Sequence, residues 1–212
     1  MSTARFSIAG VLTLLLLAGC ATRPADRPAT APETAYEARE LRLAQWTEWQ
    51  LTGRLGLSQG DEGGSGRLDW SQQSDSADLR FRGTLGQGAW HLYAATDGAR
   101  LELADGQVRE ADQVEQLVNE ATGWSVPVTA LGWWVRGVAW PSGTAPTQLD
   151  LNDDGTPSRL DQAGWEVRYT RYGQGPGDLV LPTRLEAVRD GLVVKLAISR
   201  WGGMAPEASD EG

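Results

Sequence analysis

Residues 111–137, ADQVEQLVNEATGWSVPVTALGWWVRG, have a different apolar period from the sequence on either side of them. Ala111-Asp112 opens a predicted helix there, because an acidic side chain is favourable near a helix N-terminus. Gly123 ends that helix as a C-cap. Between these points the apolar residues recur at i, i+3, i+4 and i+7, the spacing of an amphipathic helix. They are Val114, Leu117, Val118 and Ala121.

A second helix is predicted directly after the first. Pro127 begins it, since proline is tolerated in the first turn of a helix, and Gly137 ends it. Its apolar face contains Val128, Leu131, Trp134 and Val135. The stretch therefore predicts two consecutive amphipathic helices.

Strand signals surround these helices on both sides. Alternation of apolar and polar residues predicts strands, and Asp-Gly pairs predict hairpin turns between them. A helix is predicted over residues 36–49, and a Gly-rich turn over residues 59–65. Before the two helices, strands are predicted at 51–58, 67–73, 79–82 and 90–94, and two short strands around the turns at 97–98 and 105–106. After the helices, strands are predicted at 147–151, 158–161, 165–169, 181–188 and 192–198.

About eleven strands in one antiparallel sheet are expected to curl, because long twisted sheets seldom stay open. A curled sheet with an apolar inner face must have that face filled or covered. Two amphipathic helices inserted between strands are suitable covers. The sequence therefore predicts a mainly β protein with some α structure: an incomplete, unclosed antiparallel β-barrel with a helical lid over an apolar cavity.

The N-terminal residues have the pattern of an export signal. Arg5 precedes an apolar stretch from Ile8 to Ala18. A run of about 11 apolar residues is too short to span a bilayer, which takes about 20, so the segment is interpreted as a signal peptide. It ends in Leu17-Ala18-Gly19-Cys20, which resembles the lipobox of bacterial lipoproteins. Cys20 is the only cysteine, so an internal disulfide cannot account for it.

Four segments follow from these patterns. Residues 1–19 form the signal peptide, and residues 20–34 form the lipidated cysteine and a flexible tether rich in Pro, Ala and Thr. Residues 35–201 form the folded domain, and residues 202–212 a disordered acidic tail. No cofactor is expected apart from the covalent N-acyl diacylglycerol on Cys20, which would anchor the chain firmly.

Charge and aromatic content restrict the partners. Cleavage removes Arg5 from the 19 basic residues and leaves 18 against 28 acidic ones, a formal net charge of −10. So acidic a chain should not bind nucleic acid or anionic lipid through electrostatics. The ten tryptophans against two phenylalanines fit an apolar cavity open to solvent, although a core that uses Trp in place of Phe would give the same count.

Several motifs, in order, resemble the LolB family of outer-membrane lipoprotein receptors. Thr84 departs from the family pattern, in which proline is usual at that position. Ala21, directly after the cysteine, resembles the outer-membrane sorting pattern, in which Asp is absent. The motifs that carry the resemblance are 49–55 (WQLTGRL), 67–72 (RLDWSQ), 83–86 (GTLG), 111–112 with 117–118, 126–128 (VPV) and 131–137 (LGWWVRG).

The resemblance implies a receptor anchored in the outer membrane and facing the periplasm. Such a protein accepts lipoproteins from a LolA-type periplasmic carrier and inserts them into the inner leaflet of the outer membrane. The implied partners are this carrier, lipoprotein acyl chains and the leaflet, with the protein acting as a monomer. A triacylated lipoprotein exposes on the order of 45 methylenes at ~0.8 kcal/mol each, so unassisted passage through water is prohibitive. No phosphate-binding loop motif is present, so transfer is expected to run downhill without ATP.

Two sets of site residues are predicted. Leu85 lies among glycines in a predicted hairpin tip with Gly83, Thr84 and Gly86, and in the family the matching leucine serves membrane delivery. A leucine folded back onto the sheet is the alternative. The second set is expected to line the acyl-chain cavity, although each member would equally suit a packed core. It comprises Trp70, Leu79, Phe81, Trp90, Leu92, Leu131, Trp134, Trp165, Val167 and Tyr169.

Catalytic and metal sites are not expected. His91 is the only histidine and is interpreted as a surface residue, and the acidic pairs 110/112 and 153–154 are interpreted as cap and turn residues. No HExxH, GxSxG or CxxC motif occurs, which argues against a hydrolase or other enzyme. The competing hypothesis is an assembly or scaffold lipoprotein that binds a protein partner and never opens a cavity.

Overall fold

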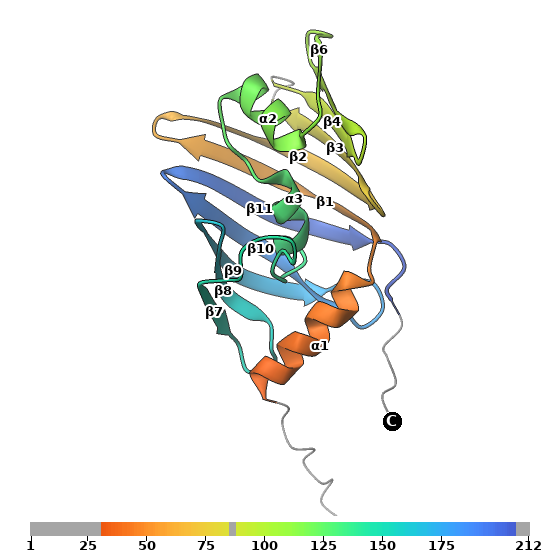
Figure 1. Cartoon of the computed structure of the whole chain (residues 1–212), viewed down its shortest axis with the longest axis vertical. Helices are drawn as coiled ribbons and strands as arrows, with labels where there is room; N and C mark the ends of the chain where they lie inside the picture. The colour runs from red at the N-terminus through yellow and green to blue at the C-terminus, as the bar shows by residue number, and fades with distance from the viewer. Residues whose placement is uncertain (1–30, 85–87, 207–212) are drawn as a thin grey trace, which may run out of the picture.

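The computed structural model describes residues 31–84 and 88–206 (Figure 1). Within these ranges, eleven strands form a single antiparallel sheet that does not close on itself, and three helices accompany it. The elements are α1 (Pro32–Ala44), β1 (Glu48–Gln59), β2 (Glu62–Gln73), β3 (Ser76–Gly83), β4 (Trp90–Ala95), β5 (Gly98–Leu103), β6 (Val108–Ala111), α2 (Val114–Thr122), α3 (Val128–Trp134), β7 (Gln148–Leu151), β8 (Pro157–Gln162), β9 (Trp165–Gln174), β10 (Val180–Arg189) and β11 (Leu192–Gly202).

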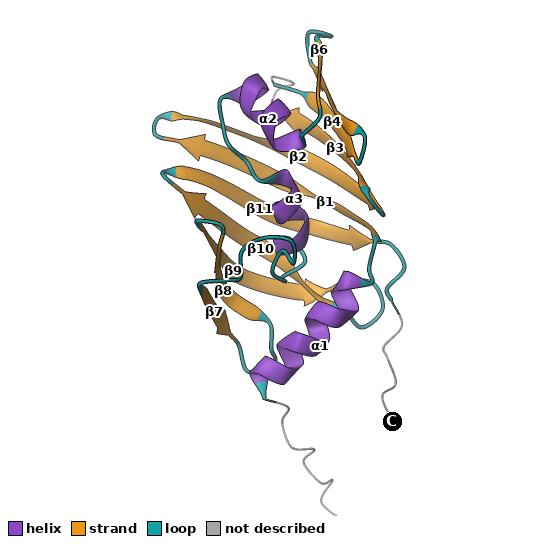
Figure 2. Cartoon of the chain, viewed as in Figure 1, coloured by secondary structure: helices purple, strands orange, loops and turns teal. Residues whose placement is uncertain are grey.

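The strand order explains why the two central helices form a lid. The order is β6-β5-β4-β3-β2-β1-β11-β10-β9-β8-β7, so β6 and β7 are the two edges although they are consecutive strands in the chain. The chain between them must travel from one edge to the other, and it does so as α2 and α3, which lie across one face of the sheet (Figure 2). The predicted unclosed barrel with a helical lid is thereby confirmed.

Alternation along the strands determines which side chains face the lid. In β1, Trp49, Leu51, Gly53 and Leu55 are buried, while the residues that alternate with them are more exposed. The register shifts between Thr52 and Gly53, where β1 meets β11. A side chain at Gly53 would stand 2.5 Å from the Ala197 carbonyl oxygen, so the close approach of the two strands there requires glycine.

The first helix differs from its prediction at both ends. It begins at Pro32 rather than at residue 36 and therefore includes the last three residues of the predicted tether. Proline suits this position because the first helical amides need no intrahelical acceptor. The helix ends at Ala44, and Trp49, predicted as helical, lies in β1. The sequence from Trp49 onward alternates with the period of a strand, and that pattern overrides the local helix propensity.

The predicted turn over residues 59–65 is also shorter in the structure. β1 continues to Gln59 and β2 begins at Glu62, so Gly60 lies in the turn whereas Gly63 and Gly64 lie within β2. Gly66 is packed so closely that an added Cβ would lie 2.2 Å from the Arg82 carbonyl oxygen and 2.6 Å from Cζ of Phe81. Glycine is therefore used here to let neighbouring strands and an aromatic ring approach.

A pair of glycine substitutions tests this explanation. Gly66→Ala is expected to lower the free energy of unfolding by about 2 kcal/mol or more, since overpacking a filled site strains its neighbours. Gly64→Ala in the same strand meets nothing within 4 Å and should be neutral or slightly stabilising. Urea denaturation of both variants measures the difference. Equal effects at the two positions would refute the close-packing explanation.

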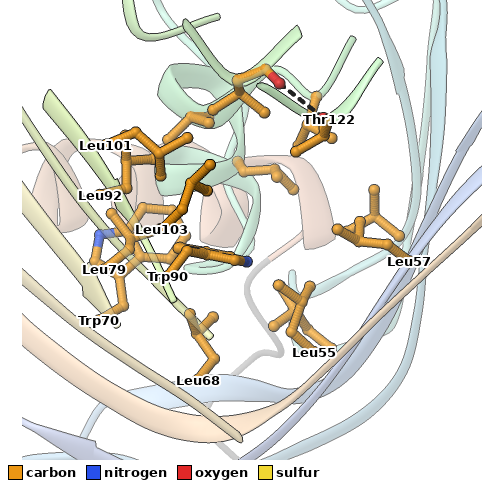
Figure 3. Close-up of a pocket in the computed structure, with 16 residues that line it drawn as sticks. Leu55, Leu57, Leu68, Trp70, Leu79, Trp90, Leu92, Leu101, Leu103 and Thr122 are labelled. Atoms are coloured by element: carbon orange, nitrogen blue, oxygen red, sulfur yellow. Dashed lines mark hydrogen bonds between the residues drawn. The ribbon is translucent and has the colours of Figure 1, made fainter. Parts of the chain in front are cut away.

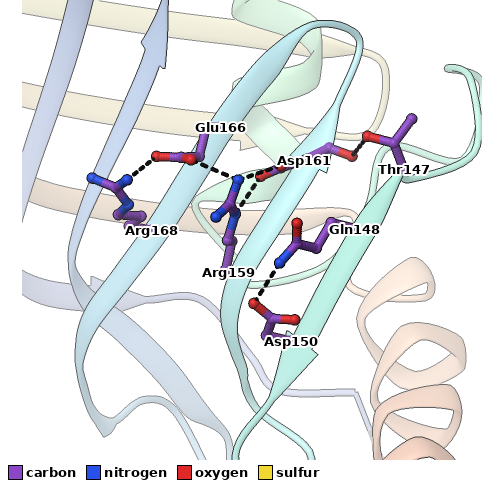
Figure 4. Close-up of polar contacts among 7 residues, drawn as sticks. All are labelled: Thr147, Gln148, Asp150, Arg159, Asp161, Glu166 and Arg168. Atoms are coloured by element: carbon purple, nitrogen blue, oxygen red, sulfur yellow. Dashed lines mark hydrogen bonds and ion pairs between the residues drawn. The ribbon is translucent and has the colours of Figure 1, made fainter.

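Polar pairs cover the opposite face of the sheet near the β7 edge (Figure 4). The Arg159 guanidinium bridges the carboxylates of Asp161 and Glu166, at 2.6 and 2.7 Å, and Glu166 also pairs with Arg168. These residues alternate with Leu160 and Val167, which are fully buried. Because these pairs are partly exposed to solvent, they are expected to contribute little stability, and they keep this face of the sheet polar.

The C-terminal segment was predicted to be disordered from residue 202. The structure instead includes Gly202 in β11, and the Pro206 carbonyl accepts a hydrogen bond from Arg42 at 3.3 Å. Residues 207–212 lie outside the described residues. Among the residues that are described, no helix combines the length and apolar character needed to cross a bilayer.

Candidate acyl-chain pocket

An apolar pocket lies between the lid and one half of the curled sheet (Figure 3). Its floor comes from β1 to β5 and β11, and its roof comes from α2, α3 and the segment between them. Thr122 is the only lining residue with a hydroxyl, amide or charged side chain, and its hydroxyl donates to the Val118 carbonyl at 2.7 Å. The lining consists of Leu55, Leu57, Leu68, Trp70, Leu79, Trp90, Leu92, Leu101, Leu103, Val118, Thr122, Val126, Val128, Leu131, Val194 and Leu196.

The pocket is apolar but narrow. Because this hydroxyl is already bonded within α2, the indole N–H groups of Trp70 and Trp90 are the remaining side-chain polar groups in the lining. The cavity volume is about 80 Å³, well below the roughly 300–1,000 Å³ of pockets that enclose small molecules. The structure therefore shows a pocket largely closed by its lid.

Five of the ten predicted cavity residues line this pocket: Trp70, Leu79, Trp90, Leu92 and Leu131. A sixth, Phe81, is half-buried on the same face and stacks on Trp90, with ring centroids 5.2 Å apart. The residues singled out from the sequence thus include the part of the floor formed by β2, β3 and β4.

The other four predicted residues lie in packed core instead of along the pocket. Trp134 of α3 fills the half of the sheet formed by β8 and β9, with its ring 6.2 Å from that of Trp165. Val167 is fully buried beside them, and the Tyr169 hydroxyl donates to the Trp134 carbonyl at 3.0 Å. Strand alternation correctly places these residues on the inner face, but a lid side chain occupies the space above them.

Gln162 holds Trp134 in this position. Its side-chain oxygen accepts from the Trp134 indole at 2.8 Å and from the Trp140 amide at 2.9 Å. Its side-chain amide donates to the carbonyls of Trp140 and Thr144, both at 2.8 Å. Gln162 is 1% exposed, so these bonds are shielded from water. One residue that the sequence did not single out therefore fixes the C-terminal part of the lid.

Gln162→Met is expected to lower the free energy of unfolding by about 3 kcal/mol, because each buried group left without a partner costs about 1–3 kcal/mol. Gln148→Met is the matched control, since Gln148 is exposed and donates only to Asp150. Its effect should stay within about 0.5 kcal/mol. Urea denaturation with tryptophan fluorescence checks both values. A Gln162 variant as stable as the control would contradict the assigned role.

The end of α3 is also attached to α1. The buried Arg136 guanidinium donates to the carbonyls of Leu43 and Trp46, at 2.7 and 3.0 Å. From the opposite direction, Arg39 of α1 donates to the carbonyls of Arg136 and Gly137. These contacts join α1, the α1–β1 connection and the end of α3.

Arg136 lies among tryptophans rather than acids. Its guanidinium is 4.3 Å from the ring centroid of Trp133 and 5.6 Å from that of Trp49. Burial lowers the pKa of the Arg136 side chain to about 10, so it stays protonated at neutral pH. No carboxylate pairs with it among the described residues. Aromatic faces and carbonyl oxygens thus stabilise this charge.

α2 makes fewer buried polar contacts with the rest of the protein than α3 does. Its Leu117 is fully buried, but its polar contacts are exposed: Arg109 donates to the Glu120 carbonyl at 2.9 Å, and Glu115 accepts from the Thr129 amide at 3.0 Å. Gly123 ends the helix with a φ of +77°, as predicted. Exposed polar contacts are weak compared with buried ones, so the polar contacts that attach α2 contribute less than those that attach α3.

Eleven pocket residues were not singled out from the sequence as cavity residues. Most of them continue the inward alternation of strands that the sequence did identify, so that signal was available. The alternation alone does not tell which half of the sheet the lid leaves open. These residues are Leu55, Leu57, Leu68, Leu101, Leu103, Val118, Thr122, Val126, Val128, Val194 and Leu196.

Three of the five polar residues considered for catalysis, His91, Glu110 and Asp154, have structural partners. His91 is partly exposed, with its Nε2 atom 2.9 Å from an Asp78 oxygen. Glu110 pairs with Arg100, and Asp154 accepts from the amide and hydroxyl of Thr156. No group of three potential metal ligands occurs among residues 31–84 and 88–206.

Two predicted sites fall outside the described residues. Cys20 precedes residue 31, and Leu85 and Gly86 lie in the gap at 85–87. Their neighbours are described: Gly83 ends β3, and the Thr84 hydroxyl donates to the Ser65 carbonyl at 2.9 Å. The connection between β3 and β4 therefore leaves the sheet beside β2, at the end of the pocket where Trp90 begins β4.

Fold and pocket together define a lidded half-barrel with an apolar interior. Residues 47–201 match the family model described as "Outer membrane lipoprotein LolB". The LolB protein of Alkalilimnicola ehrlichii is 38% identical, over 97% of this chain and 100% of the relative, and that of Stutzerimonas stutzeri is 37% identical, over 88% and 90%. The chain therefore belongs to the LolB family of outer-membrane lipoproteins.

This membership confirms the resemblance seen in the sequence, and with it the prediction of an outer-membrane lipoprotein that is not an enzyme. Among solved structures, a LolA-superfamily protein of Nitrosomonas europaea aligns with a TM-score of 0.49 and 12% identity, over 82% of this chain and 93% of that one. That likeness is too weak to carry an inference.

Proposed function

We propose that this protein accepts the acyl chains of a lipoprotein from a LolA-type periplasmic carrier and releases them into the inner leaflet of the outer membrane. The observation that carries the proposal is the pocket under α2 and α3, whose lining is apolar apart from one internally bonded hydroxyl and the indole N–H groups of Trp70 and Trp90. A single acyl chain in water exposes many methylenes at about 0.8 kcal/mol each, so a dry apolar site is the feature that a receptor needs.

Uptake requires the pocket to widen, because its volume of about 80 Å³ is too small for a long acyl chain. α3 is fixed by the buried bonds of Gln162 and Arg136. α2 is attached mainly by exposed contacts and by Leu117. The acyl chain therefore enters by displacing α2 from β5 and β6, while α3 stays in place.

Release into the membrane depends on Leu85 and on the anchor. The β3–β4 connection that contains Leu85 begins beside Ser65, at the Trp90 end of the pocket. An apolar side chain there would meet the leaflet close to where the chains leave. Acylation of Cys20 keeps the protein at that membrane, since two or more chains give a firm anchor.

A transfer assay tests this function. The chain from residue 20 onward, with Cys20→Ala, is mixed with a carrier loaded with a triacylated lipoprotein. The lipoprotein should move from the carrier to this protein without ATP. A pull-down separates the two proteins and shows which one holds the cargo. Binding of the carrier without transfer of lipoprotein would favour the assembly-scaffold alternative.

A further inference from the structure

A second space adjoins the apolar pocket and is larger than the pocket itself. This groove has a volume of about 510 Å³ and lies between α3, the start of α2 and the turns that join β2 to β3 and β4 to β5. Trp70 and Val128 line both spaces, so these two side chains form the boundary between them (Figure 3). An acyl chain too long for the pocket therefore has room beyond a single layer of side chains.

The lining of the groove suits an amphiphilic ligand. Ala77, Ala94 and Val114 contribute partly buried apolar side chains from β3, β4 and α2. Most of the exposed residues in the lining are polar, as Asp75 and Asp112 are. An acyl chain in the groove would thus have apolar contacts, while a polar head group could remain in water among the exposed residues.

No hydrogen bond fixes Trp70 at the boundary. Its indole Nε1 is buried and has no partner in the part of the chain that the structure describes, and the residue is 3% exposed. By contrast, the indole of Trp134 donates to Gln162 at 2.8 Å. A buried donor without an acceptor is unfavourable, so the Trp70 ring is less firmly held in its position than the Trp134 ring.

α3 faces the Trp70 ring with a glycine. A Cβ atom at Gly132 would lie 3.6 Å from Cζ2 of Trp70, so the ring packs against the backbone of α3 at this position and not against a side chain. A rotation of the Trp70 side chain would open the boundary and give its indole N–H access to water in the groove. The missing hydrogen bond would then be made, which offsets part of the packing that the ring loses.

We infer that the groove is a second compartment of the acyl-binding site and that Trp70 is the side chain that moves to join it to the pocket. In the loaded protein an acyl chain runs from the pocket past Trp70 into the groove, whose volume is in the range of pockets that enclose small molecules. The inference rests on the proposed function, because it assumes that the pocket receives acyl chains. It adds where the rest of a long chain lies.

Ligands of two lengths test the second compartment, on the chain from residue 20 onward with Cys20→Ala. Ala94→Trp fills the groove and should weaken binding of methyl palmitate at least about tenfold, since each methylene left in water weakens binding about fourfold. Its effect on methyl octanoate should stay below about twofold, because a short chain needs only the widened pocket. Tyr93→Trp, on the opposite face of β4, is the matched control and should change neither affinity. Equal weakening of both esters, or of neither, by folded Ala94→Trp would overturn the inference.

Hydrogen exchange of the ¹⁵N-labelled indoles tests the movement of Trp70 without altering the groove. Single Trp→Phe variants assign the signals. Exchange of the Trp70 indole proton with water should become at least about tenfold faster when methyl palmitate is bound, because the ring leaves its buried position. Trp165 is the control: its indole is also buried without a partner among the described residues, but it lines neither space, so its exchange rate should not change.

The methyl signals of Leu92 and Leu101, two residues of the pocket lining, report whether the pocket is filled. If methyl palmitate shifts these signals and the Trp70 indole exchanges no faster, the inference is overturned and the proposed function stands. If neither ester shifts them, the proposed acyl-binding function itself fails.

Discussion

Leu57→Trp is expected to abolish acyl-chain uptake while the protein stays folded. Leu57 lies on β1 in the floor of the pocket and is only partly buried. An indole there would occupy a cavity whose volume is about 80 Å³. The sheet cannot move aside as α2 can, so opening the lid would not restore the space. We expect at least about a tenfold loss of affinity for a fluorescent fatty acid, with overpacking lowering stability by about 1–3 kcal/mol.

The neighbouring residue on the same strand provides the control. Ser58 follows Leu57, and successive side chains of a strand point to opposite faces of the sheet. Ser58→Trp should therefore retain wild-type binding, and a thermal melt shows whether each variant is folded. Normal binding by folded Leu57→Trp would mean that acyl chains do not enter this pocket.

Leu85→Glu is expected to block delivery into membranes without preventing uptake from the carrier. A glutamate is costly to bring into the hydrocarbon region, so the β3–β4 connection could no longer engage the leaflet. Lipoprotein should accumulate on this protein, and its insertion into liposomes should fall at least about tenfold. The measurement is flotation of liposomes after mixing with the loaded carrier.

Leu41→Glu is the matched control for this variant. Leu41 is 71% exposed on α1, away from the β3–β4 connection. The glutamate of Leu41→Glu therefore places the same negative charge on a different surface. Delivery by Leu41→Glu should equal that of the wild type. If Leu85→Glu inserts lipoprotein at the normal rate, the membrane role of this leucine is wrong.

Much of the fold could be predicted because its determinants are periodic. The helical spacing of Val114, Leu117 and Val118 stands out against the alternation of the surrounding strands. A sheet of so many strands is expected to curl, and its apolar inner face must then be covered. The order of the elements then leads to a half-barrel with a lid. These inferences need only the spacing of apolar residues over short stretches, which can be read from the sequence.

The position of the open space could not be predicted in the same way. Trp70 and Trp165 both lie on inward-facing strand positions, yet one lines the pocket and the other is packed in the core. The difference comes from Trp134, which descends from the lid and is held by Gln162. Such a contact joins residues far apart in the chain, and no local pattern reveals it.

Glycine gave a misleading signal for a related reason. Residues 59–65 predict a turn because they are rich in glycine. Gly63 and Gly64 instead lie within β2, where the nearby Gly66 makes room for Phe81 and for the backbone of Arg82. Whether a glycine bends the chain or admits a neighbour depends on the packing of other strands.

The most direct test of the account is to find where the acyl chains lie during transfer. A lipoprotein whose acyl chains contain a photoreactive diazirine is passed from the carrier to this protein, irradiated, and analysed by mass spectrometry. Adducts should fall on pocket residues such as Leu92, Leu101 and Val118. They should be absent from Tyr93, which neighbours Leu92 on β4 but is exposed on the opposite face. Adducts on Tyr93 and the outer face, with none in the pocket, would contradict the account.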